Sequence, residues 1–208
     1  MKPFPASAAS GPVRCAALLA TLLLSACSVL PTAEPVDVYL LPAASQAVSA
    51  SAPLPWTLRV TRPLTGATLA GRYILVEEGG RLSSIKGARW SDPVPVLLRD
   101  RLLDGFRADG RIVGLSSDDK AVQADFELDS ELRQFHSVNQ GEQAEAVIRL
   151  DARLVRTGSQ RIVASRRFEI RQPVDGRGAG PRVQAFGVAA DRLGSALVDW
   201  AITAAATY

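Results

Sequence analysis

The chain has 208 residues, among them 24 Lys and Arg, 21 Asp and Glu, one His and two Cys. Two of the basic residues and none of the acidic ones precede Cys27, so the chain from Cys27 onward is nearly neutral, which argues against nucleic acid as a partner. Because no cysteine follows Cys27 and His136 is the only histidine, composition excludes disulfides and cysteine-ligated metals in the folded part and argues against any metal site.

The first 26 residues have the organisation of a bacterial secretion signal. Lys2 and Arg14 give a positive segment, and residues 15–26 form an apolar run. The run matches a signal-peptide core and is too short to span a bilayer, which takes about 20 residues. It closes on a sequence that resembles the lipobox of bacterial lipoproteins, formed by Leu24, Ser25, Ala26 and Cys27. We therefore predict a signal peptide over residues 1–26 and a covalent lipid on Cys27.

Lipidation at Cys27 predicts where the mature protein resides. Each buried CH₂ group contributes about 0.8 kcal/mol, so several acyl chains anchor a protein stably. In the usual Gram-negative pathway an Asp after the lipidated Cys favours retention at the inner membrane, and this chain has Ser28 there. We therefore expect an outer-membrane anchor, a tether over residues 27–35, and a single domain over residues 36–208 that faces the periplasm.

The first half of that domain predicts short strands and one helix. Residues 36–41 are rich in β-forming side chains, and residues 42–55, rich in Ala, Ser and Pro, predict a loop. Alternation or turn signals predict further strands at residues 56–62, 72–77, 81–86 and 112–115. A helix is predicted from Pro93, with Asp92 as its N-cap, to Gly110.

The second half predicts three long strands and a final helix. Apolar side chains alternate over residues 124–132, 146–154 and 162–170, which is typical of an antiparallel meander with one buried face. A loop rich in Gly and Arg is predicted over residues 174–182, and the spacing of apolar residues predicts a helix over residues 186–204. The sum predicts an α+β fold, a mostly antiparallel sheet with two helices packed on one face.

Several of these features in order resemble one family. They are the lipobox, Tyr39-Leu40-Leu41, Trp90 followed by Pro93 or Pro95, Phe106, the turn before Arg161, Phe168, Ala185-Phe186 and Trp200. The chain resembles the ABC-type transport auxiliary lipoproteins, the PqiC-like group associated with MCE-domain transport systems. The resemblance implies an outer-membrane component that docks the periplasmic end of an MCE protein. An ABC permease and ATPase would then supply energy for moving lipids, and self-association remains open.

The candidate chemical groups favour binding over catalysis. His136 is interpreted as a surface residue at a strand end, since no nucleophile motif accompanies it. The acidic residues from Asp125 to Glu131 and arginines of the neighbouring strands predict cross-strand ion pairs on a solvated face, with a polar protein-docking surface as the alternative. The Gly-rich segment at residues 176–180 lacks the Lys of a phosphate-binding loop.

The residues considered for contact with a partner or lipid are Trp56, Trp90, Arg177 and Arg182. We predict a non-enzymatic binding protein without a cofactor other than the lipid on Cys27. The alternative is an envelope-assembly lipoprotein that partners an outer-membrane β-barrel, and a third possibility is an anchored hydrolase.

Overall fold

A computed structural model describes residues 35–43, 52–120 and 122–207. The chain divides into two compact units, Met1–Pro35 and Val36–Tyr208, and the second contains every helix and strand described below. Cys27, its lipobox and the predicted signal peptide lie outside the described residues. Among the described residues, no helix is both long enough and apolar enough to span a membrane.

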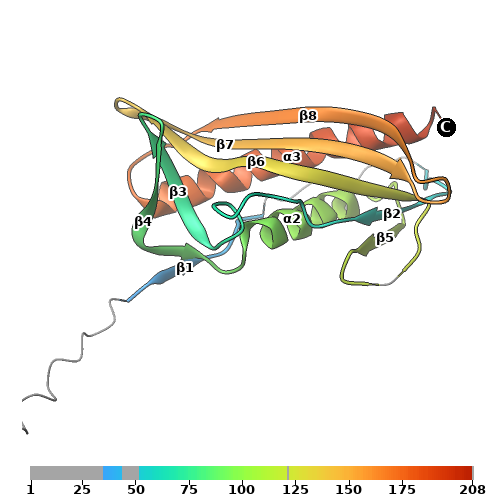
Figure 1. Ribbon diagram of the computed structural model, residues 1–208, viewed down its shortest axis with the longest axis horizontal. Helices are drawn as coiled ribbons and strands as arrows, with labels where there is room; N and C mark the ends of the chain where they lie inside the picture. The colour runs from blue at the N-terminus through green and yellow to red at the C-terminus, as the bar shows by residue number, and fades with distance from the viewer. Residues whose placement is uncertain (1–34, 44–51, 121, 208) are drawn as a thin grey trace, which may run out of the picture. The chain divides into compact units, whose positions relative to one another are not determined.

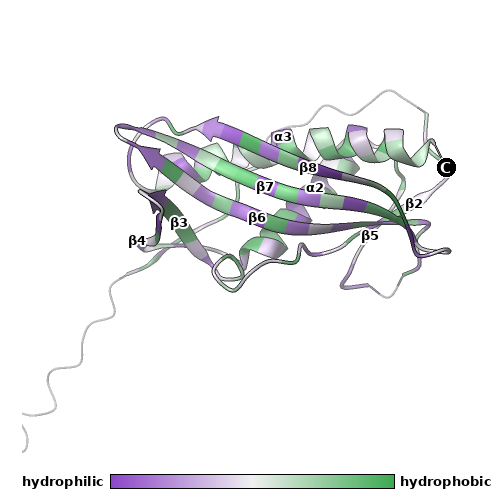
Figure 2. Ribbon diagram, turned by 45° about the horizontal axis from the view of Figure 1, so that its top comes forward, coloured by the Kyte–Doolittle hydropathy of each residue, from purple (hydrophilic) through white to green (hydrophobic). Residues whose placement is uncertain are grey.

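Three long strands form the main part of the sheet, as Figure 1 shows. They are β6 (Phe126–Gln140), β7 (Gln143–Arg156) and β8 (Arg161–Pro173). β7 pairs antiparallel with both neighbours, so the predicted meander is confirmed. Green and purple alternate along β6 and β7 in Figure 2, because every second side chain faces the buried side of the sheet.

The other edge of β6 is long enough to receive two short parallel strands. β2 (Thr57–Val60) pairs with residues 126–128, and β3 (Tyr73–Glu78) pairs with residues 137–139. β5 (Gly114–Ser117) then pairs parallel with β2. β4 (Arg81–Trp90) forms the predicted hairpin with β3, and β1 (Asp37–Tyr39) pairs parallel with β4.

Among the described residues, four of the seven strand pairings are therefore parallel. The prediction of a mostly antiparallel sheet is wrong, and the eight strands form a mixed sheet. The reason is that sequence periodicity and turn signals reveal hairpins between neighbouring strands. Parallel pairs join segments that are far apart in the chain, and no local signal marks them.

Two helices, α2 (Val94–Asp109) and α3 (Ala179–Ala205), pack side by side beneath the sheet (Figure 1). α2 starts one residue later than predicted, because Pro93 has an extended ψ of 135° and serves as the N-cap. α3 starts seven residues earlier than predicted. Pro181 lies in its first turn, where a helix needs no backbone N–H donor, so the Gly-rich segment enters the helix rather than remaining a loop.

An aromatic cluster fills the core between sheet and helices at the end where β3 and β4 lie. The ring centroid of Trp90 lies 5.8 Å from that of Phe135 and 5.7 Å from that of Phe186, in edge-to-face contacts. The rings of Phe135 and Phe186 stack at 4.6 Å. These contacts join β4, β6 and α3 into one core, and such pairs contribute about 0.5–1.5 kcal/mol each beyond area burial.

Candidate functional site

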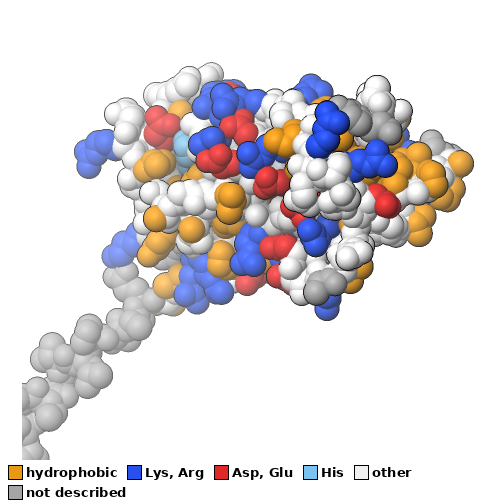
Figure 3. Space-filling model, turned by 45° about the vertical axis from the view of Figure 1, so that its right-hand side comes forward, with side chains coloured by type: hydrophobic (Ala, Val, Ile, Leu, Met, Phe, Trp, Pro, Cys, Tyr) orange, Lys and Arg blue, Asp and Glu red, His pale blue; other side chains and the backbone are white. Residues whose placement is uncertain are grey.

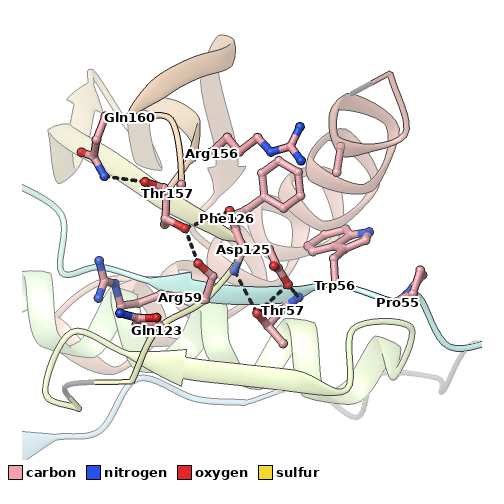
Figure 4. A pocket seen from close by; sticks show the side chains of 13 residues that line it. Pro55, Trp56, Thr57, Arg59, Gln123, Asp125, Phe126, Arg156, Thr157 and Gln160 are labelled. Atoms are coloured by element: carbon pink, nitrogen blue, oxygen red, sulfur yellow. Dashed lines mark hydrogen bonds between the residues drawn. The ribbon is translucent and has the colours of Figure 1, made fainter.

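A cleft of about 770 Å³ opens at the end of the sheet where β2 begins and the β7–β8 turn lies (Figure 4). β2, the start of β6, the β7–β8 turn and the end of α3 supply its walls. The residues that line it are Pro55, Trp56, Thr57, Arg59, Gln123, Ala124, Asp125, Phe126, Arg156, Thr157, Gly158, Gln160 and Ala205. A volume of this size is within the range of small-molecule and side-chain binding sites.

Two aromatic rings form the apolar wall of the cleft. Trp56 immediately precedes β2 and Phe126 opens β6, and the parallel pairing of these strands brings the rings together. Their centroids lie 5.2 Å apart at an interplanar angle of 74°. Phe126 is buried, whereas Trp56 is only partly buried and presents the rest of its surface to the cleft.

Asp125 and Thr57 hold the floor of the cleft in place. The backbone N–H and the hydroxyl of Thr57 donate to Asp125 Oδ2 at 2.8 and 2.9 Å, and the Asp125 N–H donates back to Thr57 Oγ1 at 2.9 Å (Figure 4). The hydrogen bond from the Thr57 backbone is the largest of the effects that lower the pKa of Asp125. The carboxylate is therefore ionised and structurally engaged at neutral pH.

Two arginines at the cleft differ in how they are paired. Arg59 Nε donates to Glu127 Oε2 at 2.7 Å, so its charge is neutralised locally. The side chain of Arg156 forms no ion pair or hydrogen bond within the part of the chain that the structure describes, and its charge acts on Asp125 only at longer range. The cleft therefore combines an aromatic wall with one guanidinium that is available for an anionic group.

His136 is not part of this cleft, and its predicted place at a strand end on the surface is wrong. It lies within β6 and is only 5% exposed, because it faces Val147 of β7 and the neighbouring β3. Its Nε2 lies 3.3 Å from Glu77 Oε2, while burial is the larger effect and lowers the pKa of His136. The imidazole is therefore neutral at pH 7.

The geometry of the cleft supports binding rather than acid–base chemistry. Its one carboxylate that is engaged by hydrogen bonds, Asp125, has Thr57 as its partner and no basic group within hydrogen-bond distance. Within the described residues, no group of three or more His, Cys, Asp and Glu side chains is arranged to hold a metal ion. The side chains that remain accessible are those of Trp56 and Arg156, which suit recognition of a partner or ligand.

The sheet face opposite the helices carries the predicted ion pairs. Arg153 Nη2 lies 2.7 Å from Asp129 Oδ2, and Arg149 Nη2 lies 2.7 Å from Glu169 Oε2. Hydrogen bonds from Arg167 are the largest effect lowering the pKa of Asp151. Figure 3 shows blue and red side chains side by side on the face where the histidine is visible. Because the charges are paired with one another, this face carries no strong field of either sign.

The predicted contact residues do not come together. Trp90 is 1% exposed and belongs to the aromatic core, so it lines no surface. Arg182 lies in the first turn of α3, and its Nε and Nη2 donate to Ser137 Oγ and Asn139 Oδ1 at 3.1 and 3.0 Å. Arg177 is exposed in the short segment before α3, and Trp56 alone lines the cleft.

Sequence reasoning missed Phe126, Asp125 and Arg156 as residues of the cleft. The alternation of β6 and β7 assigned them only to a buried or a solvated face. A pairing between Thr57 and Asp125 was the missing information, because it fixes the parallel register of β2 against β6. No local pattern in the sequence carries that register.

A family model for the ABC-type transport auxiliary lipoprotein component matches residues 39–198, from β1 almost to the end of α3. The chain belongs to this family. The match covers α2, most of α3 and every strand except the first two residues of β1, so the resemblance seen in the sequence is confirmed. The family is one of transport auxiliary lipoproteins and not a class of enzymes.

Individual proteins share sequence or fold with this chain. An uncharacterized protein of Bradyrhizobium diazoefficiens is 30% identical over 149 residues, which is 71% of this chain, and this chain spans 40% of that relative's length. The crystal structure of a protein from Xanthomonas campestris has a TM-score of 0.77 and 25% identity, covering 83% of this chain and 98% of the other. A second crystal structure, of an uncharacterized protein, shares the fold with a TM-score of 0.63 at 16% identity, covering 80% and 99% of the two chains.

Proposed function

We propose that this auxiliary lipoprotein is the outer-membrane component of an MCE/ABC-type system that moves lipids between the two membranes. Its lipid anchor on Cys27 holds it at the outer membrane with the domain in the periplasm. The domain docks the periplasmic end of an MCE-domain protein, whose permease and ATPase reside in the inner membrane. The observation that carries the proposal is the family match over residues 39–198.

Two features of the chain support a role in anchoring and docking, with the energy supplied by the partner ATPase. Leu24-Ser25-Ala26-Cys27 stands at the end of an apolar run of signal-peptide length, which is where a lipidated cysteine is expected. The Gly-rich segment at residues 176–180 has no following Lys-Ser or Lys-Thr, so it lacks the groups that grip nucleotide phosphates. Energy for transport therefore comes from the partner ATPase, and this chain contributes binding without an enzymatic step or a further cofactor.

The cleft is the place where we expect the MCE protein to dock. A partly exposed Trp against a buried Phe is typical of a binding hot spot, which takes an apolar side chain of the partner. Arg156 adds a positive charge at the same opening, which favours an acidic group beside that apolar residue. The ion-paired sheet face is a weaker candidate for docking, because its charged side chains already pair with one another. Exposed ion pairs of this kind contribute only about 0–1 kcal/mol of free energy.

The decisive test is affinity purification of the tagged, lipidated protein from solubilised envelopes, followed by mass spectrometry. Recovery of an MCE-domain protein with its permease and ATPase supports the proposal. Recovery of an outer-membrane β-barrel without MCE components overturns it in favour of an envelope-assembly role. Incorporation of labelled palmitate into the wild-type protein, and its loss in Cys27→Ala, tests the anchor separately.

A further inference from the structure

An exposed row of apolar side chains lies on β1, at the opposite end of the sheet from the cleft. Val36, Val38 and Leu40 are 47%, 52% and 73% exposed, whereas Tyr39 and Leu41, which alternate with them, pack against the core. A strand with one face in water normally carries polar side chains on that face. Here the outward side chains Val36, Val38 and Leu40 are all apolar, which indicates that something other than water covers this face.

The row continues across the two neighbouring strands. Val38 is the register partner of Arg89 on β4, and Arg89 is in turn the partner of Tyr73 on β3. Side chains of register partners share a face of the sheet, so Val38, Arg89 and Tyr73 project on the same side. Arg89 is exposed and Tyr73 is 60% exposed. We call Val36, Val38, Leu40, Tyr73 and Arg89 the β1 patch.

The composition of the β1 patch fits a lipid surface. Aliphatic side chains favour the boundary of the acyl region, and Tyr is enriched at headgroup level, where its ring is buried and its hydroxyl is hydrated. Arg89 has no ion pair among the residues that the structure describes, and an unpaired guanidinium at a membrane surface attracts phosphate groups.

The number of residues before β1 limits how far the β1 patch can lie from the lipidated Cys27. Eight residues, 28–35, separate Cys27 from Val36. A fully extended chain spans at most about 3.3–3.6 Å per residue, so Val36 lies within roughly 30 Å of the lipidated cysteine. The end of the domain that carries the β1 patch is therefore held close to the bilayer in which the acyl chains reside.

We propose that the β1 patch rests on the membrane surface in which the acyl chains of Cys27 are anchored, and so sets the orientation of the domain. This inference rests on the lipid anchor of the proposed function. β6 connects the two ends: β3 pairs with its residues 137–139, near the patch, and β2 pairs with its residues 126–128, at the cleft. At about 3.3 Å per residue the two sites are separated by roughly 30 Å.

The consequence is a division between the two ends of the sheet, which Figure 1 places at opposite sides of the view. The end with β1 and β4 meets lipid. The end with β2 and the β7–β8 turn points away from the membrane, where a partner that crosses the periplasm arrives. An anchor at Cys27 alone would not fix the direction in which the cleft faces, so membrane contact at the β1 patch lowers the entropic cost of docking.

Site-directed spin labelling on the full-length lipidated protein tests the proposal. Because the mature chain has no cysteine besides the lipidated Cys27, the variants Val38→Cys and Leu40→Cys carry one label each. Val113→Cys and Ile162→Cys are matched controls, because both side chains are exposed and both lie near the cleft. Ile162 is two residues after Gln160, which lines the cleft, and Val113 precedes Gly114, the register partner of Thr57. The proteins are incorporated into vesicles of phosphatidylethanolamine with a minority of phosphatidylglycerol, and accessibility to oxygen and to a water-soluble nickel chelate is measured.

We expect the labels at residues 38 and 40 to be several-fold less accessible to the nickel chelate than those at residues 113 and 162, and more accessible to oxygen. Equal accessibility at all four sites, in protein that floats with the vesicles, overturns the β1 patch but leaves the anchor intact. Protein that does not float overturns the anchor itself. Spin–spin broadening at residue 38 in the non-lipidated Cys27→Ser variant identifies a second copy as the occupant and also overturns the proposal.

Discussion

Arg101 of α2 and Asp191 of α3 form a buried ion pair between the two helices, with side chains that are 7% and 14% exposed. Burial lowers the pKa of Arg101, so keeping its guanidinium charged between the helices has a cost in solvation. A second bridge, at 2.9 Å, joins Asp199 of α3 to Arg111, which lies two residues after the end of α2. Asp191 and Asp199 of α3 therefore both form ion pairs with arginines of α2 or of the chain directly after it.

Removing one partner of the Arg101–Asp191 pair should be costly. Arg101→Leu leaves a buried carboxylate without its cation, and we expect the free energy of unfolding to fall by about 3 kcal/mol. The double variant Arg101→Leu with Asp191→Leu should be more stable than the single variant, because no uncompensated charge remains. Urea denaturation of the soluble domain measures both. A single variant as stable as wild type would contradict the role assigned to the pair.

The guanidinium of Arg182 should stabilise the start of α3. It joins this turn to Ser137 and Asn139 of β6. Arg182→Met therefore removes two hydrogen bonds between the helix and the strand, and leaves Ser137 Oγ and Asn139 Oδ1 without this donor. We expect a loss of about 1–3 kcal/mol in unfolding free energy. Arg177→Met, five residues earlier in an exposed segment, is the matched control and should change stability by less than about 0.5 kcal/mol. Equal effects of the two substitutions would exclude this role.

Gly187 should be required for close approach of the chain after β1 to α3. A Cβ at this position would lie 3.0 Å from the carbonyl oxygen and from Cβ of Pro42. We expect Gly187→Ala to destabilise the fold by about 1–3 kcal/mol, since backbone must move to admit the methyl group. Gly180→Ala, where a Cβ meets nothing within 4 Å, should leave stability unchanged or slightly raised. Thermal unfolding followed by circular dichroism compares the two, and similar melting temperatures would refute the contact.

Stability should decrease as the pH falls through the range where His136 titrates. Burial lowers the pKa of His136 in the folded protein below its ordinary value of about 6.5, so the unfolded chain binds the proton first. Stability is therefore fully present above about pH 7 and declines toward pH 5, with a slope of at most about 1.4 kcal/mol per pH unit. His136→Gln should flatten this dependence. An unchanged slope in that variant would show that another group is responsible.

Docking at the cleft should depend on Trp56 and Arg156. Trp56→Ala removes the aromatic hot spot, and Arg156→Glu reverses the unpaired charge, so each should reduce recovery of the MCE protein by tenfold or more, about 1.4 kcal/mol in binding energy. Arg177→Glu makes the same charge change outside the cleft and should leave recovery unaffected. The readout is quantitative mass spectrometry of the affinity-purified complex, with soluble-domain unfolding as a check on folding. Loss with Arg177→Glu alone would move the docking surface to the start of α3.

Local patterns in the sequence predicted the helices and strands better than they predicted which strands pair with one another. The meander of β6, β7 and β8 and the helix α2 follow from alternation and from apolar spacing, which each segment displays by itself. The parallel pairs of β2 and β3 with β6 were missed, because residues about 60 positions apart carry no shared local signal. A similar reason applies to His136, whose burial depends on β3 and β7 rather than on its own strand.

The positions of Trp56, Trp90 and Arg182 could not be predicted from the sequence alone. By itself, the sequence determined that the chain belongs with the auxiliary lipoproteins and that its long strands alternate apolar and polar faces, since both depend on short-range order and spacing. The lipobox at Cys27 stays a prediction from the same kind of local pattern. Only the tertiary structure decided that Trp90 fills the core while Trp56 lines the cleft, and that Arg182 binds β6. Each outcome depends on which distant strand or helix lies against the side chain, and long-range packing alone sets that.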